Sequence, residues 1–188
     1  MNAKVQIQFS EQSVPFYSAA DIISAYSLAS ETATQLRTLA NQISKATAFV
    51  KTFVQESERA DPSIFAELEN LIIISQQLAD SQADTYMREL NRHTHKPDDQ
   101  YSAGDLFDAY SLTHENTSWL ETMFYQVKDE VEVVKEAIKQ GTHGAVFGTL
   151  EHLIHIAAYL AESHSNTFDV EREKYEMEWN QIGGDQND

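Results

Sequence analysis

The residues best suited to chemistry in this 188-residue chain are histidines and a glutamate near position 150. His152 and His155 are three positions apart, and Glu151 lies four positions before His155. On a helix these side chains share one face, where imidazole and carboxylate groups could bind a divalent metal or respond to pH. No third histidine follows at a metal-binding spacing. Glu151, His152 and His155 are therefore weak metal candidates, and exposed polar residues on an outward face are the alternative.

Four glutamates at corresponding positions of two similar segments raise the question of a di-iron centre. They are Glu31, Glu69, Glu115 and Glu151. Such a centre in a helical bundle needs Glu-x-x-His pairs, which this sequence lacks. We interpret these residues as solvent-exposed or interhelical salt-bridging carboxylates. His164 falls on an apolar helical seam, which favours a hydrogen-bonded core histidine.

Other catalytic signatures are missing from the sequence. The chain has no cysteine, which excludes disulfides, thiolate metal sites and cysteine nucleophiles. It contains no phosphate-binding G-x-x-x-x-G-K-[ST], no dinucleotide-binding G-x-G-x-x-G and no G-x-S-x-G motif. We therefore expect a protein that is not an enzyme and has no cofactor.

The acidic charge is the strongest compositional signal. The formal net charge is −17, and residues 95–188 carry 19 acidic against 6 basic residues, whereas residues 1–94 carry 11 against 7. This field repels phosphates and anionic membranes, so we expect no direct binding to nucleic acid or membrane. A protein partner with a basic surface fits the charge, although acidity for solubility alone is the alternative.

The elements that position these residues belong to two similar segments, which indicate an internal sequence repeat. Residues 17–28, YSAADIISAYSL, return 84 positions later as YSAGDLFDAYSL, and residues 65–90 align with 147–172 at an offset of 82. Ser18–Asp21 and Ser102–Asp105 are capping-box patterns that start helices. The apolar residues then recur with helical spacing, which predicts helices over about 19–59, 62–91, 103–140 and 144–179.

We therefore predict an all-α four-helix bundle built from a tandem duplication of an antiparallel helical hairpin, with a short N-terminal extended segment. The expected parts are an arm or strand over residues 1–16, hairpins over 17–92 and 101–179, a linker over 93–100 and a disordered tail over 180–188. Residues 17–179 should form one compact domain. An elongated arrangement, in which each hairpin buries its seam by oligomerisation, is the alternative.

The N-terminal residues 4–9, KVQIQF, alternate between polar and apolar, which places Val5, Ile7 and Phe9 on one face of a strand. A single strand leaves its backbone groups unpaired. These residues could pair with a second copy in a homodimer or with a partner's sheet, and a mobile terminus is the simpler alternative.

The leading functional hypothesis is a non-enzymatic protein–protein interaction protein in the cytosol of a bacterium or of a phage-infected host. Its partner-binding candidates are acidic and aromatic residues of the third helix: Asp108, Glu115, Trp119, Glu121, Phe124, Tyr125, Asp129, Glu132 and Glu136. A sharper version is a decoy that mimics nucleic-acid charge and inhibits a basic nucleic-acid-binding protein, as phage inhibitors of host defence do. The alternative is a metal- or small-ligand-binding bundle that uses the histidine and carboxylate patch.

Overall fold

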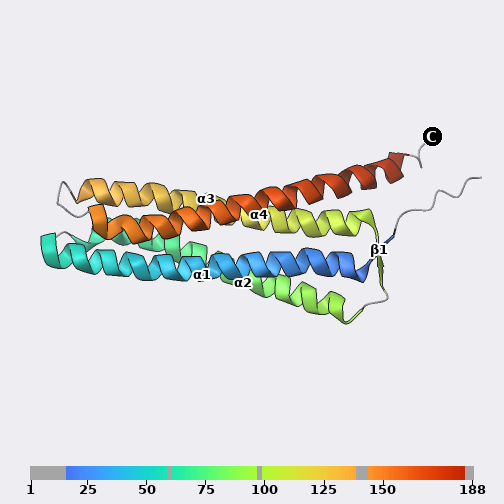
Figure 1. Cartoon of the computed structure of the whole chain (residues 1–188), viewed down its shortest axis with the longest axis horizontal. Helices are drawn as coiled ribbons and strands as arrows, with labels where there is room; N and C mark the ends of the chain where they lie inside the picture. Colours follow the sequence, from blue (N-terminus) through green and yellow to red (C-terminus); the bar gives the residue numbers. More distant parts are fainter. Residues whose placement is uncertain (1–15, 59–60, 97–98, 139–143, 185–188) are drawn as a thin grey trace, which may run out of the picture.

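The computed structural model describes residues 16–58, 61–96, 99–138 and 144–184, and it is the predicted all-α four-helix bundle (Figure 1). The main helices are α1 (Ala19–Glu58), α2 (Ala66–Thr94), α3 (Ala103–Ala137) and α4 (Gly144–Gly184). A 3₁₀ turn, η1 (Pro62–Phe65), precedes α2. Two short strands, β1 (Tyr17–Ser18) and β2 (Gln100–Tyr101), precede α1 and α3. Val5, Ile7 and Phe9 lie outside the described residues.

The helices run up and down in sequence order (Figure 1). The strongest pairings are α1 with α2 and α3 with α4, and α1 also packs on α4 while α2 packs on α3. The two hairpins therefore share one core, and the elongated alternative is wrong for this chain. None of the helices in the described residues is long and apolar enough to cross a membrane.

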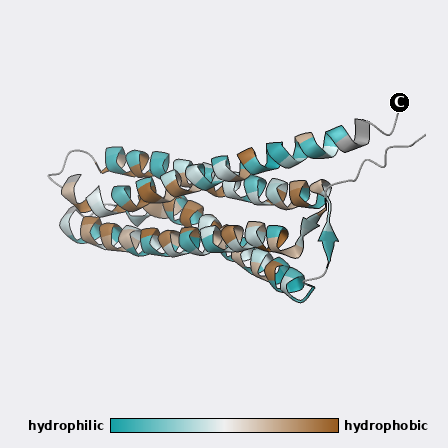
Figure 2. Cartoon of the chain, turned by 45° about the vertical axis from the view of Figure 1, so that its right-hand side comes forward, coloured by the Kyte–Doolittle hydropathy of each residue, from teal (hydrophilic) through white to brown (hydrophobic). Residues whose placement is uncertain are grey.

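The core divides into an aliphatic half and a tyrosine-rich half. Leu36, Ile43 and Val50 of the predicted α1 seam are buried in the aliphatic half, and Ile22 is buried in the other half. Burial of such side chains contributes about 1.5–3 kcal/mol each. Figure 2 shows hydrophobic and hydrophilic bands in alternation along the helices, whereas the C-terminal part of α4 is mainly hydrophilic.

The helix starts follow the predicted caps. Ser102 and Asp105 form a complete capping box at α3, which satisfies two backbone N–H groups that have no helical partner. Ser18 donates its backbone N–H to the Asp21 carboxylate at 2.9 Å. Asp61 caps η1 by accepting from the backbone N–H of Ser63.

The two strands pair through equivalent residues of the two repeats, a contact that the sequence did not predict. β1 and β2 are antiparallel, and Tyr17 lies opposite Tyr101, its equivalent at the offset of 84. Equivalent residues can face each other in this way only where an approximate two-fold axis passes between them. The two hairpins are therefore tied together at the end where α1 and α3 begin.

Two predicted boundaries are too short. Helix α2 continues to Thr94, into the predicted linker, and α4 continues to Gly184, into the predicted tail. For α2 the reason is burial of His93 against Tyr26 and Tyr101 of the tyrosine-rich half of the core. The His93 side chain continues the inward-facing seam of α2 beyond the apolar pattern visible in the sequence.

Candidate functional site

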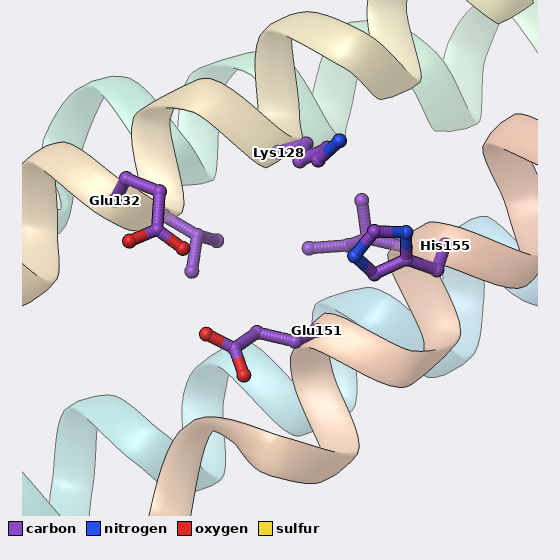
Figure 3. A pocket seen from close by; sticks show the side chains of 6 residues that line it. Lys128, Glu132, Glu151 and His155 are labelled. Carbon is purple, nitrogen blue, oxygen red and sulfur yellow. The ribbon is translucent and has the colours of Figure 1, made fainter. Parts of the chain in front are cut away.

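Two of the three weak metal candidates, Glu151 and His155, border an open pocket of about 210 Å³ between α3 and α4 (Figure 3). Its lining residues are Lys128, Val131, Glu132, Glu151, Ile154 and His155. Figure 3 shows the four polar side chains arranged around the opening, with Glu132 and Glu151 on one side of it and Lys128 and His155 on the other. His152 is exposed and is not among the lining residues.

A second pocket of about 210 Å³ lies at the equivalent place between α1 and α2. Its residues correspond one by one to those of the first at the two repeat offsets: Ser44, Thr47, Ala48, Glu69, Ile72 and Ile73. The shape is therefore a property of the hairpin. What the second hairpin adds is Lys128, Glu132 and His155 in place of Ser44, Ala48 and Ile73.

An ion pair common to both hairpins neutralises the pocket glutamates. Lys135 Nζ lies 2.5 Å from a Glu151 oxygen and 3.0 Å from a Glu132 oxygen. The hydrogen bond to Glu151, followed by that to Glu132, raises the pKa of Lys135. In the first hairpin Lys51 contacts Glu69 in the same way, at 2.7 Å. The salt-bridging interpretation is therefore confirmed for Glu69 and Glu151.

The same ion pair argues against a metal at this position, because a metal would have to displace Lys135 from both carboxylates. Among the residues that the structure describes, no group of three or more histidine, aspartate or glutamate side chains is placed to hold a metal ion. Glu31 and Glu115 are exposed, in line with their interpretation as solvated carboxylates.

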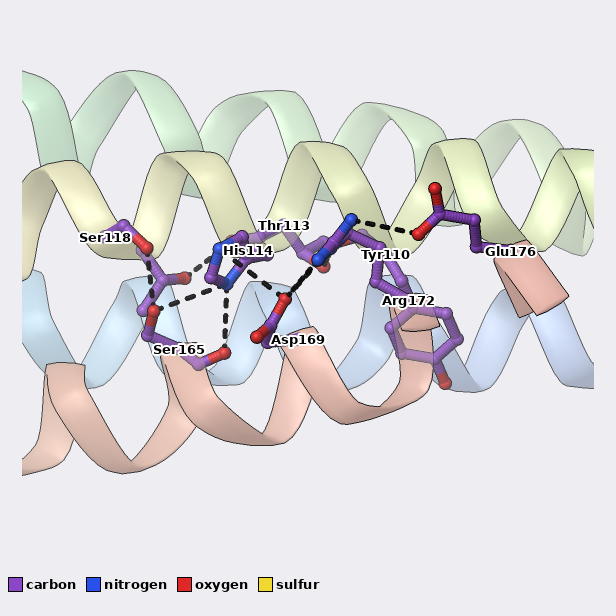
Figure 4. Close-up of polar contacts among 9 residues, drawn as sticks. Tyr110, Thr113, His114, Ser118, Ser165, Asp169, Arg172 and Glu176 are labelled. Atoms are coloured by element: carbon purple, nitrogen blue, oxygen red, sulfur yellow. Dashed lines mark hydrogen bonds and ion pairs between the residues drawn. The ribbon is translucent and has the colours of Figure 1, made fainter. Parts of the chain in front are cut away.

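A polar network between α3 and α4 contains serine, histidine and aspartate, the residue types of a nucleophilic triad (Figure 4). His114 Nδ1 lies 3.1 Å from the main-chain oxygen of Ser165, and the two hydroxyls of Ser118 and Ser165 are 2.7 Å apart. His114 Nε2 lies 3.8 Å from an Asp169 oxygen. Catalysis by such a triad also requires an accessible serine hydroxyl and groups that stabilise an oxyanion.

The geometry does not fit a nucleophile. Asp169 is held by Arg172 through bonds of 2.7 and 2.9 Å, and this bond to Asp169 raises the pKa of Arg172. Ser165 is buried at 4% exposure, and it lies inside α4, where backbone N–H groups bond within the helix and cannot stabilise an oxyanion. The network instead joins α3 to α4.

Sequence reasoning missed this network, although a signal was present. His114 and Ser118 are four apart on α3, and Ser165 and Asp169 are four apart on α4, followed by Arg172 three positions later. Such spacings place side chains on one helical face. The equivalent residues of the first hairpin are mostly small or apolar: Ser30, Thr34, Ala83, Met87 and Leu90.

Two further histidines are wholly or partly buried. His164 is partly buried on the predicted seam with its ring stacked on Phe168 at 6.2 Å, and burial lowers its pKa. His93, which the sequence placed in a polar linker, is buried at 6% exposure. Its Nδ1 lies 2.8 Å from the Tyr101 hydroxyl and its ring stacks on Tyr26. Desolvation lowers the pKa of His93.

Eight of the nine partner-binding candidates separate into three groups, and Trp119 lies apart from them. Phe124 is the first group and corrects the prediction, because it is 1% exposed in the aliphatic core and cannot touch a partner. Glu121, Tyr125 and Glu132 lie toward α4. The Tyr125 hydroxyl donates to Glu162 at 3.2 Å, and burial, followed by the charge of Glu162, raises the pKa of Glu121.

The third group is an acidic row on the outer face of α3, made of Asp108, Glu115, Asp129 and Glu136. Multiples of seven residues separate them, which places them along one line of the helix. All four are exposed, and within the described part of the chain none takes part in an ion pair. The equivalent positions of α1 hold Ser24, Glu31, Lys45 and Thr52.

Trp119 lies beside this row on the side of α2 and is 51% exposed. It is four positions after Glu115, so it belongs to the neighbouring line on the helix surface. The surface that the structure brings together from the predicted set is therefore the acidic row with Trp119.

Comparison with known proteins adds no family to this picture, since no family model, no curated protein and no solved structure matches the chain.

Proposed function

We propose that this chain is a non-enzymatic interaction protein and that the acidic row of α3 binds a basic protein surface. The observation that supports this proposal is that folding makes no use of the row. Several other carboxylates of the second hairpin are paired with lysine or arginine, as Glu151 is with Lys135 and Asp169 with Arg172. The four carboxylates of the row remain exposed to solvent and have no such partner in the described residues.

The row acts through long-range attraction more than through contact energy. Exposed charges of one sign accelerate encounter with a surface of opposite sign, and salt screens that attraction over about 8–10 Å. Binding should therefore weaken steeply when the salt concentration is raised.

A decoy of nucleic acid would need negative charges at closer spacing than the acidic row provides. Carboxylates seven residues apart on a helix are about 10.5 Å apart along its axis, whereas one DNA strand carries a phosphate about every 3.4 Å. The row also has a gap at Thr122. The proposal that we carry forward is therefore a basic protein partner in general, of which a nucleic-acid-binding protein is one case.

A matched pair of variants tests the proposal by affinity capture from cells at low and high salt. The acid-row variant is D108N/E115Q/D129N/E136Q. The control, E31Q/E56Q/D80N/D84N, removes the same number of negative charges from exposed positions of the first hairpin. We expect a partner that wild type and control retain, that the acid-row variant loses and that high salt releases. Equal capture by all three proteins would contradict the proposal.

Small-ligand or metal binding at the α3/α4 pocket is the second candidate. It is favoured by one observation, the charged residues that only this member of the two equivalent pockets carries. Calorimetric titration with zinc, iron and nickel tests the metal form, with H152A/H155A as the control. Stoichiometric binding that the double variant loses would support it, and heats equal to those of buffer would remove it.

The homodimer through residues 4–9 stays a prediction. Light scattering before and after deletion of residues 1–12 tests it. A mass that halves on deletion supports strand pairing between copies, and an unchanged mass disposes of it.

A further inference from the structure

Beside the acidic row, a groove of about 260 Å³ runs between α2 and α3. Its lining residues are Glu67 and Leu71 of α2 and Gln126, Asp129, Glu130 and Val133 of α3. Asp129 belongs to both the groove and the acidic row. The groove is therefore continuous with the surface to which we assign partner binding.

The floor of the groove is apolar and exposed. Val133 is 55% exposed. Ile74 lies seven positions after Glu67 and Trp119 seven before Gln126, so the antiparallel register of α2 and α3 places them, at 41% and 51% exposure, on the same side beyond the end of the groove. Trp119 and Val133 are fourteen residues apart on α3, which corresponds to about 21 Å. Exposed apolar side chains along such a line are the usual floor of a site that receives a helix.

The rim of the groove is acidic and unpaired. Glu67, Asp129 and Glu130 surround the floor, and in the part of the chain that the structure describes none of them forms an ion pair. Lysine and arginine suit such a place because their aliphatic stems pack on apolar surface while their charged ends reach carboxylates.

The equivalent positions of α4 and α1 lack this rim. Thr149, Lys45 and Ala46 stand where the α2/α3 groove has Glu67, Asp129 and Glu130, and exposed Phe49 stands in the place of Val133. The two hairpins thus offer the same framework with and without the acidic rim, and Phe49 supplies a matched control position.

We propose that the α2/α3 groove binds a basic amphipathic helix of the partner, with the apolar side of that helix on Val133 and Trp119 and its lysines or arginines at the rim. This inference rests on the proposed function, because it names the kind of segment that the acidic surface receives. A helix of about fourteen residues spans the floor, with anchors at spacings of three, four or seven residues. A second copy of the chain is a poor occupant, since its net charge of −17 repels the rim.

Two synthetic peptides of 18 residues test the groove. One carries leucine at helical spacing with lysine elsewhere, and the other has the same composition in an order without an apolar face. The full chain is used as a W179F variant, because Trp119 and Trp179 are its two tryptophans, so that fluorescence then reports on Trp119 alone. We expect saturable binding of the amphipathic peptide with a blue shift, at least tenfold tighter than that of the isomer.

Two variants that add the same charge separate the groove from the rest of the surface. V133D in that background should weaken binding of the amphipathic peptide about tenfold or more, whereas F49D should leave it unchanged. Both positions are exposed, and circular dichroism checks that both variants fold.

The possible outcomes are distinct. Equal affinity for the two peptides, lost in the acid-row variant, would overturn the groove while leaving the acidic surface as the binding site. Equal effects of V133D and F49D would also overturn the groove. If neither peptide binds, the groove receives no basic helix, whatever the capture experiment finds.

Discussion

Truncation of Phe124 to alanine should destabilise the protein far more than truncation of its neighbour Tyr125. Phe124 is 1% exposed within the aliphatic half of the core, and Tyr125 is 39% exposed. Removal of a fully buried phenylalanine side chain costs about 3–5 kcal/mol, because apolar surface and packing contacts are both lost. Loss of Tyr125 removes one exposed hydrogen bond to Glu162, which costs under about 1 kcal/mol.

The difference is large compared with the total stability of a domain, which is about 5–15 kcal/mol. For a chain of this length, 1 kcal/mol shifts Tm by about 2–4 °C. F124A should therefore lower Tm by about 6–20 °C, while Y125A lowers it by less than about 4 °C. Urea unfolding followed by circular dichroism gives the free energies of unfolding. An unchanged m-value would show that each variant exposes the same surface on unfolding as wild type.

Equal shifts for F124A and Y125A would refute the assignment of Phe124 to the core. They would also return Phe124 to the set of surface residues available to a partner. The same pair then serves the binding experiments, since Y125A tests a surface position without disturbing the fold.

Two further predictions follow from the difference between the hairpins. Because burial lowers the pKa of His93 below 6.5, its neutral form contributes stability that is complete above pH 6.5 and is lost as the pH falls toward its folded-state pKa. His93→Tyr, which copies the equivalent Tyr175, should therefore lose less unfolding free energy than wild type between pH 7.5 and 5.5, and identical pH profiles would contradict this role. Gly148→Ala should raise the free energy of unfolding by about 0.5–1 kcal/mol, since the added Cβ meets no atom within 4 Å. Gly104→Ala places a Cβ 3.1 Å from the Trp179 ring and should therefore shift tryptophan fluorescence. Urea unfolding compares the two glycine variants, and an equal gain in both without a fluorescence change would show that the Trp179 contact is unimportant.

The sequence predicted what depends on neighbours along the chain. The start of α3 needs only the Ser102–Asp105 box, and the course of α1 needs only the spacing of its apolar residues. The sequence also held the evidence that corrects Phe124. Leu120, Phe124, Val127 and Val131 recur at spacings of four and three, which is the inward line of α3.

Contacts between distant segments could not be predicted in this way. The pairing of Tyr17 with Tyr101 involves strands of two residues, too short for any alternating pattern. His93 lies in a polar stretch, and its burial depends on rings contributed by Tyr26 and Tyr101 from elsewhere in the chain. The acidic candidates of α3 were visible in the sequence, but only the structure shows that Glu132 pairs with Lys135 while the acidic row forms no ion pair in the described residues.

The aromatic contacts at the strand end show how the hairpins are locked together. His93 stacks on Tyr26 of its own hairpin and meets Tyr101 of the other edge-on, with ring centres 5.3 Å apart. Its equivalent, Tyr175, stacks on Tyr110 and meets Tyr17 edge-on at the same 5.3 Å. The second helix of each hairpin thus contacts the short strand that precedes the other hairpin.

This reciprocal arrangement separates folding from the proposed function. The residues that close the bundle occur in equivalent pairs, as do Lys51 with Glu69 and Lys135 with Glu151. In the acidic row, only Glu115 has an acidic equivalent, Glu31, and the rim residues Glu67, Asp129 and Glu130 correspond to Thr149, Lys45 and Ala46. Because these carboxylates are exposed or, for Glu130, half-buried, and form no ion pair in the described residues, their removal should leave stability within about 0.5 kcal/mol of wild type per substitution. A loss of partner binding in those variants would then report on recognition and not on the fold.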